Sequence, residues 1–150
     1  MTEEKIKSYW QQFKQEENSM VENYSAWSYG DSPEMADELA LLTVQKIKTA
    51  TTSALELYEE DEPVPQVGEY NIILNGSGLP VCITKTKKVE VVAFDQVSKE
   101  HAYNEGEGDR SLTDWRKVHQ DFFEKEYAQQ NKTFSTDSAC LCETFEVVFI

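Results

Sequence analysis

Basic residues are scarce in this 150-residue chain: 14 Lys and Arg stand against 28 Asp and Glu, for a formal net charge of −14. Proteins that bind along a nucleic acid usually neutralise several phosphates with a basic surface. The densest group of bases here is the KTKK at residues 85–88. The charge therefore argues against a protein that grips a long nucleic acid along a basic face. Contact with a nucleotide or a short RNA is expected to be local, at one small cleft.

Cysteine and histidine are also few. Cys82, Cys140 and Cys142 make an odd count without CxxC spacing. Cys140 and Cys142 stand two apart in a predicted strand, so they point to one face and cannot easily bridge each other. Because the chain has only two histidines, a structural zinc site is not expected. Buried thiols in a reducing compartment are the favoured interpretation, so the predicted location is the cytoplasm.

Long apolar runs are missing as well. No segment approaches the roughly 18 apolar residues that span a bilayer, and the charged start MTEEKIKSYW does not resemble a secretory signal. The chain is instead 39% hydrophobic and 11% aromatic, with only 6 Gly and 4 Pro. This composition is typical of a soluble globular domain, and the length suits one domain with one core. We expect no membrane partner, and the sequence leaves the oligomeric state open.

Hydrophobic periodicity and turn residues predict a helix over residues 3–17, a linker over 24–30 and a second helix capped by Asp31 or Ser32, with Pro33 in its first turn. Further along we expect strands at 51–58, 69–75, 80–86, 88–97 and 139–150, and a third long helix capped by Ser111. The βαβ alternation of a parallel, doubly wound sheet is missing. The predicted fold class is therefore α+β, a small, mostly antiparallel barrel flanked by helices.

The first group of residues that could carry chemistry is Lys48 with Thr49, Thr51, Thr52 and Ser53. In an extended segment Thr49, Thr51 and Ser53 share one face, while Lys48 begins the other. A desolvated Lys held against a hydroxyl can act as its base. Helix ends also collect Lys for electrostatic reasons alone, and Thr favours strands. On composition alone the structural explanation is the better one.

A second group is HAYNEGEGD at residues 101–109, in which Glu105, Glu107 and Asp109 are spaced two apart between glycines. These acids could present hard oxygen ligands to Mg²⁺ or Mn²⁺, or place one carboxylate in a cleft as a general acid or base. A solvated acidic loop explains the pattern equally simply. His101 has no motif that would supply it with a nucleophile.

Other aromatic and imidazole groups are open to two interpretations. His119 falls on the aromatic face of the third predicted helix, where a core histidine with satisfied hydrogen bonds is the simpler explanation. Trp27 and Tyr29 stand in the predicted linker. A nucleobase could stack on them, or they could pack against the first helix.

Three segments taken together resemble a bacterial ASCH domain protein: AWSYGDSPEMADELALLTVQKIKTATTS, VPQVGEYNIILNGSGLPVCITKTKKVEVVAFDQV and HAYNEGEGDRSLTDWRKVHQDFF. The resemblance covers roughly residues 24–150. It implies a PUA-like fold, with one domain over 1–150 in which residues 1–30 form a helical extension packed on it. It also implies a cleft in which the KTAT segment faces the loop after His101.

The resemblance implies three functions: RNA binding, metal-dependent RNA cleavage, and hydrolysis of N4-acylated cytidines. In the amidohydrolase members a Lys, a Thr three residues later and a distant Glu act together, which here corresponds to Lys48, Thr51 and Glu105. This prediction has Thr51 attack the acyl carbonyl, Lys48 activate it and Glu105 carry a proton to the leaving amine. No cofactor is needed for that reaction.

Substrate-binding positions follow from the same comparison and from the linker aromatics; they are Trp27, Tyr29, Thr49, Ser53 and His101. The ribonuclease alternative would use Mn²⁺ or Mg²⁺ on Glu107 and Asp109, and the third alternative is a regulatory RNA-binding module without activity. Two positions depart from the compact amidohydrolases. Ser53 replaces an Arg, which removes a cation from the cleft, and Lys46 replaces a Gly at a helix end suited to the left-handed conformation.

Overall fold

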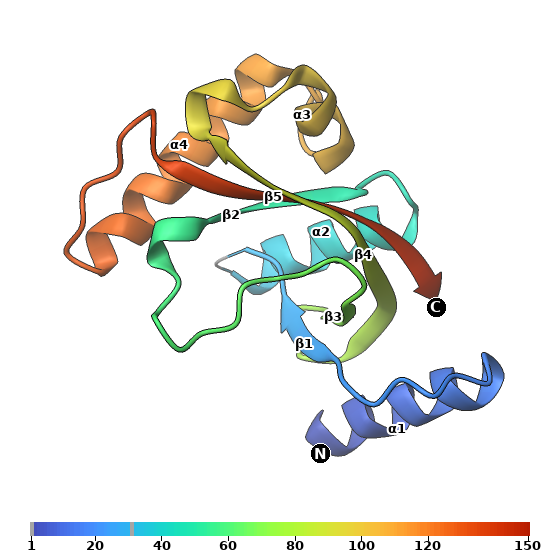
Figure 1. Cartoon of the computed structure of the whole chain (residues 1–150). Coiled ribbons are helices and arrows are strands. Elements are labelled where there is room, and N and C mark those ends of the chain that lie inside the picture. Colours follow the sequence, from blue (N-terminus) through green and yellow to red (C-terminus); the bar gives the residue numbers. More distant parts are fainter. Residues whose placement is uncertain (1, 31) are drawn as a thin grey trace. The chain divides into compact units, whose positions relative to one another are not determined.

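The computed structural model describes residues 2–30 and 32–150 (Figure 1). Asp31, the alternative cap of the second helix, lies outside the described residues. The helices are α1 (Thr2–Glu16), α2 (Pro33–Val44), α3 (Lys99–Glu105) and α4 (Leu112–Gln129), with short 3₁₀ turns at Leu55–Leu57 and Phe94–Gln96. The strands are β1 (Ser25–Ser28), β2 (Ala50–Ala54), β3 (Tyr70–Leu74), β4 (Pro80–Ala93) and β5 (Ala139–Phe149).

Hydrogen bonds join the strands in the order β1-β3-β4-β5-β2. β1 pairs with β3 in parallel, whereas β3 with β4 and β2 with β5 are antiparallel pairs. The chain forms two compact units, of residues 1–47, 67–87 and 145–150, and of residues 48–66 and 88–144. The α+β class with a mostly antiparallel sheet, expected from the sequence, is thereby confirmed.

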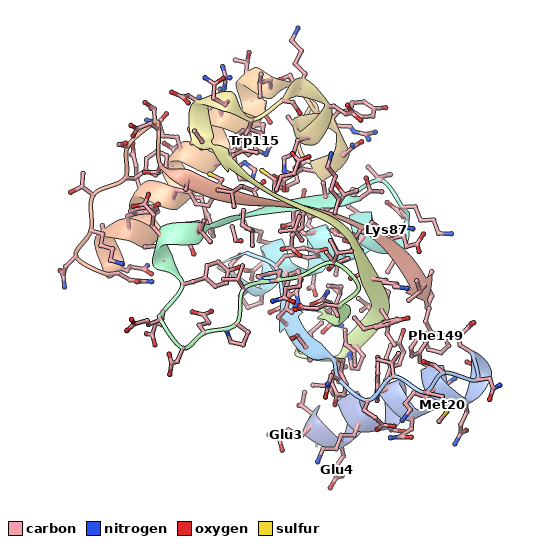
Figure 2. The ribbon with its side chains drawn as sticks, in the orientation of Figure 1. Glu3, Glu4, Met20, Lys87, Trp115 and Phe149 are labelled. Carbon is pink, nitrogen blue, oxygen red and sulfur yellow. The ribbon has the colours of Figure 1, made fainter. Side chains whose placement is uncertain are left out.

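In the first unit α1 buries the aromatic face that its periodicity predicts. Trp10 and Phe13 are buried beside Tyr70, with ring centroids 5.9 and 5.6 Å from it. Phe13 also meets Phe149 edge-on at the end of β5 (Figure 2). Glu3 and Glu4 occupy the first turn, where acidic residues favour the helix dipole. The predicted N-terminal helix is therefore confirmed.

Two strand predictions were wrong. Residues 24–30 were expected to form a linker, but Ser25–Ser28 form β1, which pairs in parallel with Asn71–Leu74. Four residues with two serines carry no alternation strong enough to indicate a strand, so the pairing partner decides. Likewise β4 is one strand of 14 residues rather than two strands divided at Lys87. The lysines were taken as a break, yet a strand can carry charged residues where one face meets water.

α2 begins and ends as local signals predict. Ser32 is its N-cap and accepts a hydrogen bond from the Met35 amide, and Pro33 is in the first turn. Past the end of the helix Lys46 adopts a φ of 64°, and the Ile47 amide donates to the Leu42 carbonyl at 3.0 Å. The position thus has the left-handed geometry that suits Gly.

We expect Lys46→Gly to raise the free energy of unfolding by about 0.5–1 kcal/mol, because glycine adopts positive φ without the clash of a Cβ atom. Urea unfolding of the two proteins measures the difference. Lys46→Ala, which keeps the Cβ atom, should show no gain. An equal gain in both variants would contradict the backbone explanation.

The second unit has its own core, in which α4 contributes Trp115, Phe123 and Tyr127 and the preceding 3₁₀ turn contributes Phe94. Trp115 stacks on Phe94 with ring centroids 5.3 Å apart. Cys140 and Cys142 of β5 belong to the same core. Burial raises the pKa of each of these two thiols to about 12. All three cysteines are free and buried, as predicted.

Among the described residues, the helices are all too short or too polar to cross a membrane.

Candidate functional site

The predicted residues Lys48 and Glu105 meet in the second unit. Lys48 precedes β2, and Glu105 is the last residue of α3. α3 begins at the N-cap Ser98, whose hydroxyl accepts from the His101 amide, and ends at Gly106 with a φ of 76°. The left-handed turn at Gly106 ends the helix, and the chain then continues into the acidic loop that carries Glu107.

The Lys48 ammonium group is buried and surrounded by acceptors. Its Nζ donates to Glu105 Oε1 at 2.9 Å, to Glu107 Oε2 at 3.0 Å and to the Glu105 carbonyl oxygen at 3.3 Å. The side chains of Lys48 and Glu105 are 1% and 2% exposed, whereas that of Glu107 is 24% exposed. Glu107 is therefore the member of this trio that a ligand can reach from solvent.

The second oxygen of Glu105 is held from several sides. Glu105 Oε2 accepts from the Thr52 hydroxyl and from Trp115 Nε1, each at 2.6 Å. His119 Nε2 lies 3.3 Å and His101 Nε2 lies 3.6 Å from the same oxygen. With these partners the carboxylate is fixed in position, since hydrogen bonds to an ionised group are the strong ones.

These contacts determine where the protons on His119 lie. Its Nδ1 is 2.9 Å from the Trp115 carbonyl oxygen, which can only accept, so Nδ1 carries a proton. Its Nε2 faces the ionised Glu105 carboxylate, which also only accepts. Both ring nitrogens therefore donate, and His119 is an imidazolium.

The same arrangement shifts three pKa values. Burial favours a higher pKa for Glu105, but the charges of Lys48 and His119, with hydrogen bonds from the two histidines, hold its pKa well below 4.5. Burial favours a lower pKa for His119, and Glu105 outweighs it, so the pKa of His119 is raised above 6.5. Burial raises the pKa of Glu107 above 4.5, reinforced by the Glu105 charge and opposed by Lys48.

His101 is not arranged as a base for a nucleophile. Thr52 Oγ1 lies 2.7 Å from His101 Nε2 and 2.6 Å from Glu105 Oε2. Its single proton goes to the carboxylate, so the hydroxyl accepts from His101 Nε2–H. Thr52 and His101 therefore position Glu105.

Thr51 lies on the other side of the strand. Thr52 pairs with Cys142 and faces Glu105, whereas Thr51 pairs with Glu143, and successive side chains of a strand point to opposite faces. Within the described part of the chain the Thr51 side chain makes no hydrogen bond. The geometry thus unites Lys48 with Glu105, and it turns Thr51 away from the Glu105 carboxylate.

The remaining predicted substrate positions have partners of their own. Thr49 bonds weakly to the Asn104 carbonyl oxygen at 3.4 Å, and Ser53 bonds to the Tyr58 hydroxyl at 2.9 Å. Trp27 belongs to the first unit and donates through Nε1 to Asn71 Oδ1.

Tyr29, also in the first unit, is buried. Its hydroxyl lies 3.1 Å from Thr43 Oγ1, and its ring meets Trp27 edge-on at 4.9 Å. Packing within that unit therefore engages both linker aromatics.

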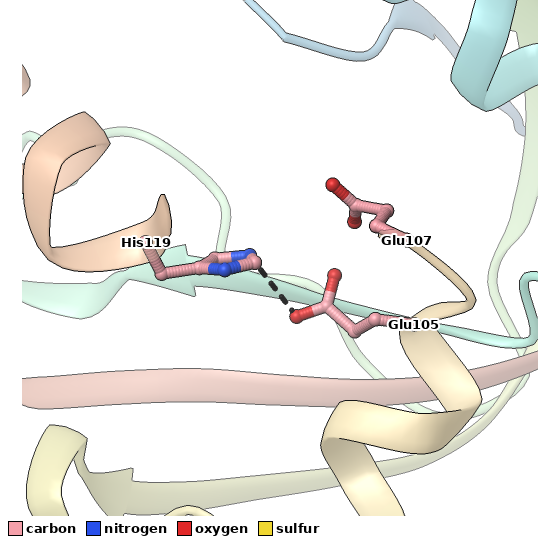
Figure 3. Close-up of side chains that lie close together, drawn as sticks. All are labelled: Glu105, Glu107 and His119. Atoms are coloured by element: carbon pink, nitrogen blue, oxygen red, sulfur yellow. Dashed lines mark ion pairs between the residues drawn. The ribbon is translucent and has the colours of Figure 1, made fainter. Parts of the chain in front are cut away.

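Three side chains could in principle offer ligand atoms to a metal ion, since those of Glu105, Glu107 and His119 lie within 4.8 Å of one another (Figure 3). The donor chemistry does not fit. The Lys48 ammonium group bonds to both carboxylates and supplies their positive charge, and His119 Nε2 needs its proton for Glu105. Asp109 is outside this cluster; its Oδ1 accepts from the Ser111 amide.

Sequence reasoning missed Thr52, Trp115 and His119 as partners of Glu105. Trp115 and His119 stand four apart, which places them on one face of α4, and this spacing was the available signal. The contact with Glu105 could not be read from it, because helix periodicity does not say which residue of another element that face meets.

Comparison with known proteins agrees with this fold. The family model for the ASCH domain matches residues 25–149. An ASCH domain structure from Lactobacillus crispatus is 30% identical, with a TM-score of 0.92 over 98% of this chain and 96% of that chain. A protein structure from Enterococcus faecalis is 36% identical, with a TM-score of 0.89 over 97% and 94% of the two chains. No curated protein matches the sequence.

Proposed function

Because the chain belongs to the ASCH domain family, we propose that it hydrolyses the amide bond of a small nucleoside-like compound, such as an N4-acylated cytidine, at Lys48. One observation carries this proposal: an ammonium group that is 1% exposed lies within 3.0 Å of two carboxylates, one of which is partly open to solvent. Clusters of this kind, with several shifted pKa values, concentrate at functional sites.

Stability alone is a poor explanation for such a cluster. Removing two opposite charges from water costs several kcal/mol per ion, and an apolar pair of the same size is often as stable. Here four charged groups share one site in the second unit: Lys48, Glu105, Glu107 and His119. An arrangement that is expensive to bury and fixed in geometry suits a preorganised electrostatic role.

The exposed fractions divide the roles. Glu105 is saturated with donors, so it positions Lys48 and stays ionised. A substrate carbonyl takes the place of Glu107 Oε2 at the Lys48 ammonium group, which then stabilises the negative oxygen as the carbonyl is attacked. Glu107, released, accepts the proton of the attacking group and passes it to the leaving amine nitrogen. In the balance one C–O bond forms and the C–N bond breaks.

The nucleophile that fits this face is a water molecule. The resemblance suggested Thr51, but Thr51 points to the face of β2 opposite Thr52 and Glu105. A water molecule next to Glu107 needs no rearrangement of the strand.

The test is the release of cytidine from N4-acetylcytidine by the purified protein, followed by chromatography. Lys48→Met should lower kcat/KM by about 10²–10³-fold, because it removes the group that stabilises the oxyanion. Lys117→Met, which changes an exposed lysine of α4, is the matched control and should be unaffected. Thr51→Val should retain most of the activity if water is the nucleophile. A wild-type protein that leaves N4-acylcytidines intact would sink the proposal.

A further inference from the structure

Arg110, in the loop between α3 and α4, is held in place by three contacts. Its amide donates to the Glu107 carbonyl oxygen at 3.0 Å, and its Nε donates to the Tyr103 carbonyl oxygen at 2.9 Å. The guanidinium carbon lies 3.6 Å from the centre of the Tyr103 ring, in stacking contact. The backbone has a φ of 65°, a conformation that a residue with a Cβ atom seldom adopts. The plane of the guanidinium group is therefore fixed by its surroundings.

This cation lacks an acidic partner within the described part of the chain, although acids outnumber bases by 28 to 14. The acids nearest in sequence bond elsewhere. Glu107 accepts from Lys48, and Asp109 accepts from the Ser111 amide. The only other arginine, Arg116, donates through Nη2 to the Asp95 carbonyl oxygen. The terminal nitrogens of Arg110 thus remain available as a pair of parallel donors.

We propose that Arg110 binds the phosphate group of a nucleotide, so that the ligand of this site is a phosphorylated nucleoside. A guanidinium group is permanently charged, and its fork of donors matches two phosphate oxygens. Its Nε and its ring face are already used to hold the loop, which leaves the terminal edge for the ligand. The amide contact with Glu107 ties this anion site to the carboxylate that borders the Lys48 ammonium group.

The proposal rests on the proposed function for the identity of the nucleoside part, but the anion site stands on Arg110 alone. Asp109 and the overall acidity act against a bound anion, so the contribution of the phosphate should be moderate and should fall with added salt. Two charge-assisted hydrogen bonds to one phosphate correspond to about a 10-fold gain in affinity or more.

The chain offers a clean spectroscopic test because it has only two arginines, and therefore two Nε–Hε signals in a ¹H–¹⁵N spectrum. We expect inorganic phosphate and cytidine 5′-monophosphate to shift the Arg110 signal saturably and to leave the Arg116 signal in place. Cytidine 5′-monophosphate should bind about 10-fold more tightly than cytidine. In Arg110→Met this difference should vanish, and in Arg116→Met it should persist.

The outcomes separate the two proposals. An Arg110 signal that phosphate does not move, or moves no more than that of Arg116, overturns the anion site. So does an Arg110→Met protein, shown to be folded by its thermal transition, that keeps the preference for the nucleotide. If phosphate shifts Arg110 but no cytidine compound is hydrolysed, the anion site stands and the amidohydrolase proposal fails. A short single-stranded oligonucleotide that binds more tightly than the mononucleotide would overturn the assignment to a nucleotide.

Discussion

Replacing Lys48 by Met is expected to lower the free energy of unfolding by about 3–5 kcal/mol, because the change leaves the buried Glu105 carboxylate without its closest cation. Glu105→Gln should destabilise for the complementary reason, since it leaves the buried ammonium group with Glu107 as its remaining carboxylate partner. Urea unfolding gives both values. Lys117→Met, on the exposed face of α4, should change stability by less than about 0.5 kcal/mol.

The double variant is the sharper measurement. Lys48→Met with Glu105→Gln leaves neither charge unpaired with respect to the other, so its loss should be smaller than the sum of the single losses by about 1–3 kcal/mol. If Lys48→Met does not fold, recovery of folded protein in the double variant reports the same coupling. Losses that simply add would show that the 2.9 Å contact contributes little and would remove the basis for a coupled ion network.

Protein stability is expected to fall as the pH rises above neutrality, through His119. A histidine whose folded pKa is raised stabilises the fold fully below its unfolded pKa, here 6.5, and loses that contribution as the pH rises through the folded pKa. The Glu105 contribution has the opposite sign. Its folded pKa is depressed, so its contribution is present above 4.5 and is lost as the pH falls through the folded value.

Glu107 narrows the window further. Its raised pKa means that ionisation destabilises the fold, and this effect sets in above 4.5 as the pH rises through its folded value. The unfolding free energy measured in urea from pH 6 to 9 should therefore decline, on the order of 1 kcal/mol. In His119→Gln the decline should flatten. A wild-type curve that is level or rises over this range would contradict the imidazolium assigned from the contacts with Trp115 and Glu105.

Local features of the fold could be predicted from sequence because a few neighbouring residues determine them. The cap of α4 is an example, since the Ser111 hydroxyl accepts from the Asp114 amide as the spacing indicates. The hairpin around residues 75–78 and the aromatic face of α1 are of the same kind. β1 was missed because its stability comes from pairing with residues 71–74, which its own four residues do not reveal.

The candidate site divides in the same way. Lys48 and Glu105 were identified through the order of segments that resembles the ASCH domain, and strand alternation separated Lys48 from the face of Thr51 in advance. The groups that fix Glu105 come from α4 and β2, and their contacts depend on how these elements pack. Tertiary contacts of this kind have no signature in a single sequence.

The release of cytidine from N4-acetylcytidine by wild-type protein, Glu107→Gln and Lys117→Met tests the account most directly. Glu107 is the partly exposed carboxylate on Lys48, so its replacement should lower kcat by about 10²–10⁴-fold with little change in folding stability. Lys117→Met should match the wild type. Hydrolysis by the wild type that survives unchanged in Glu107→Gln would contradict the assigned roles, and an inactive wild type would contradict the proposed function itself.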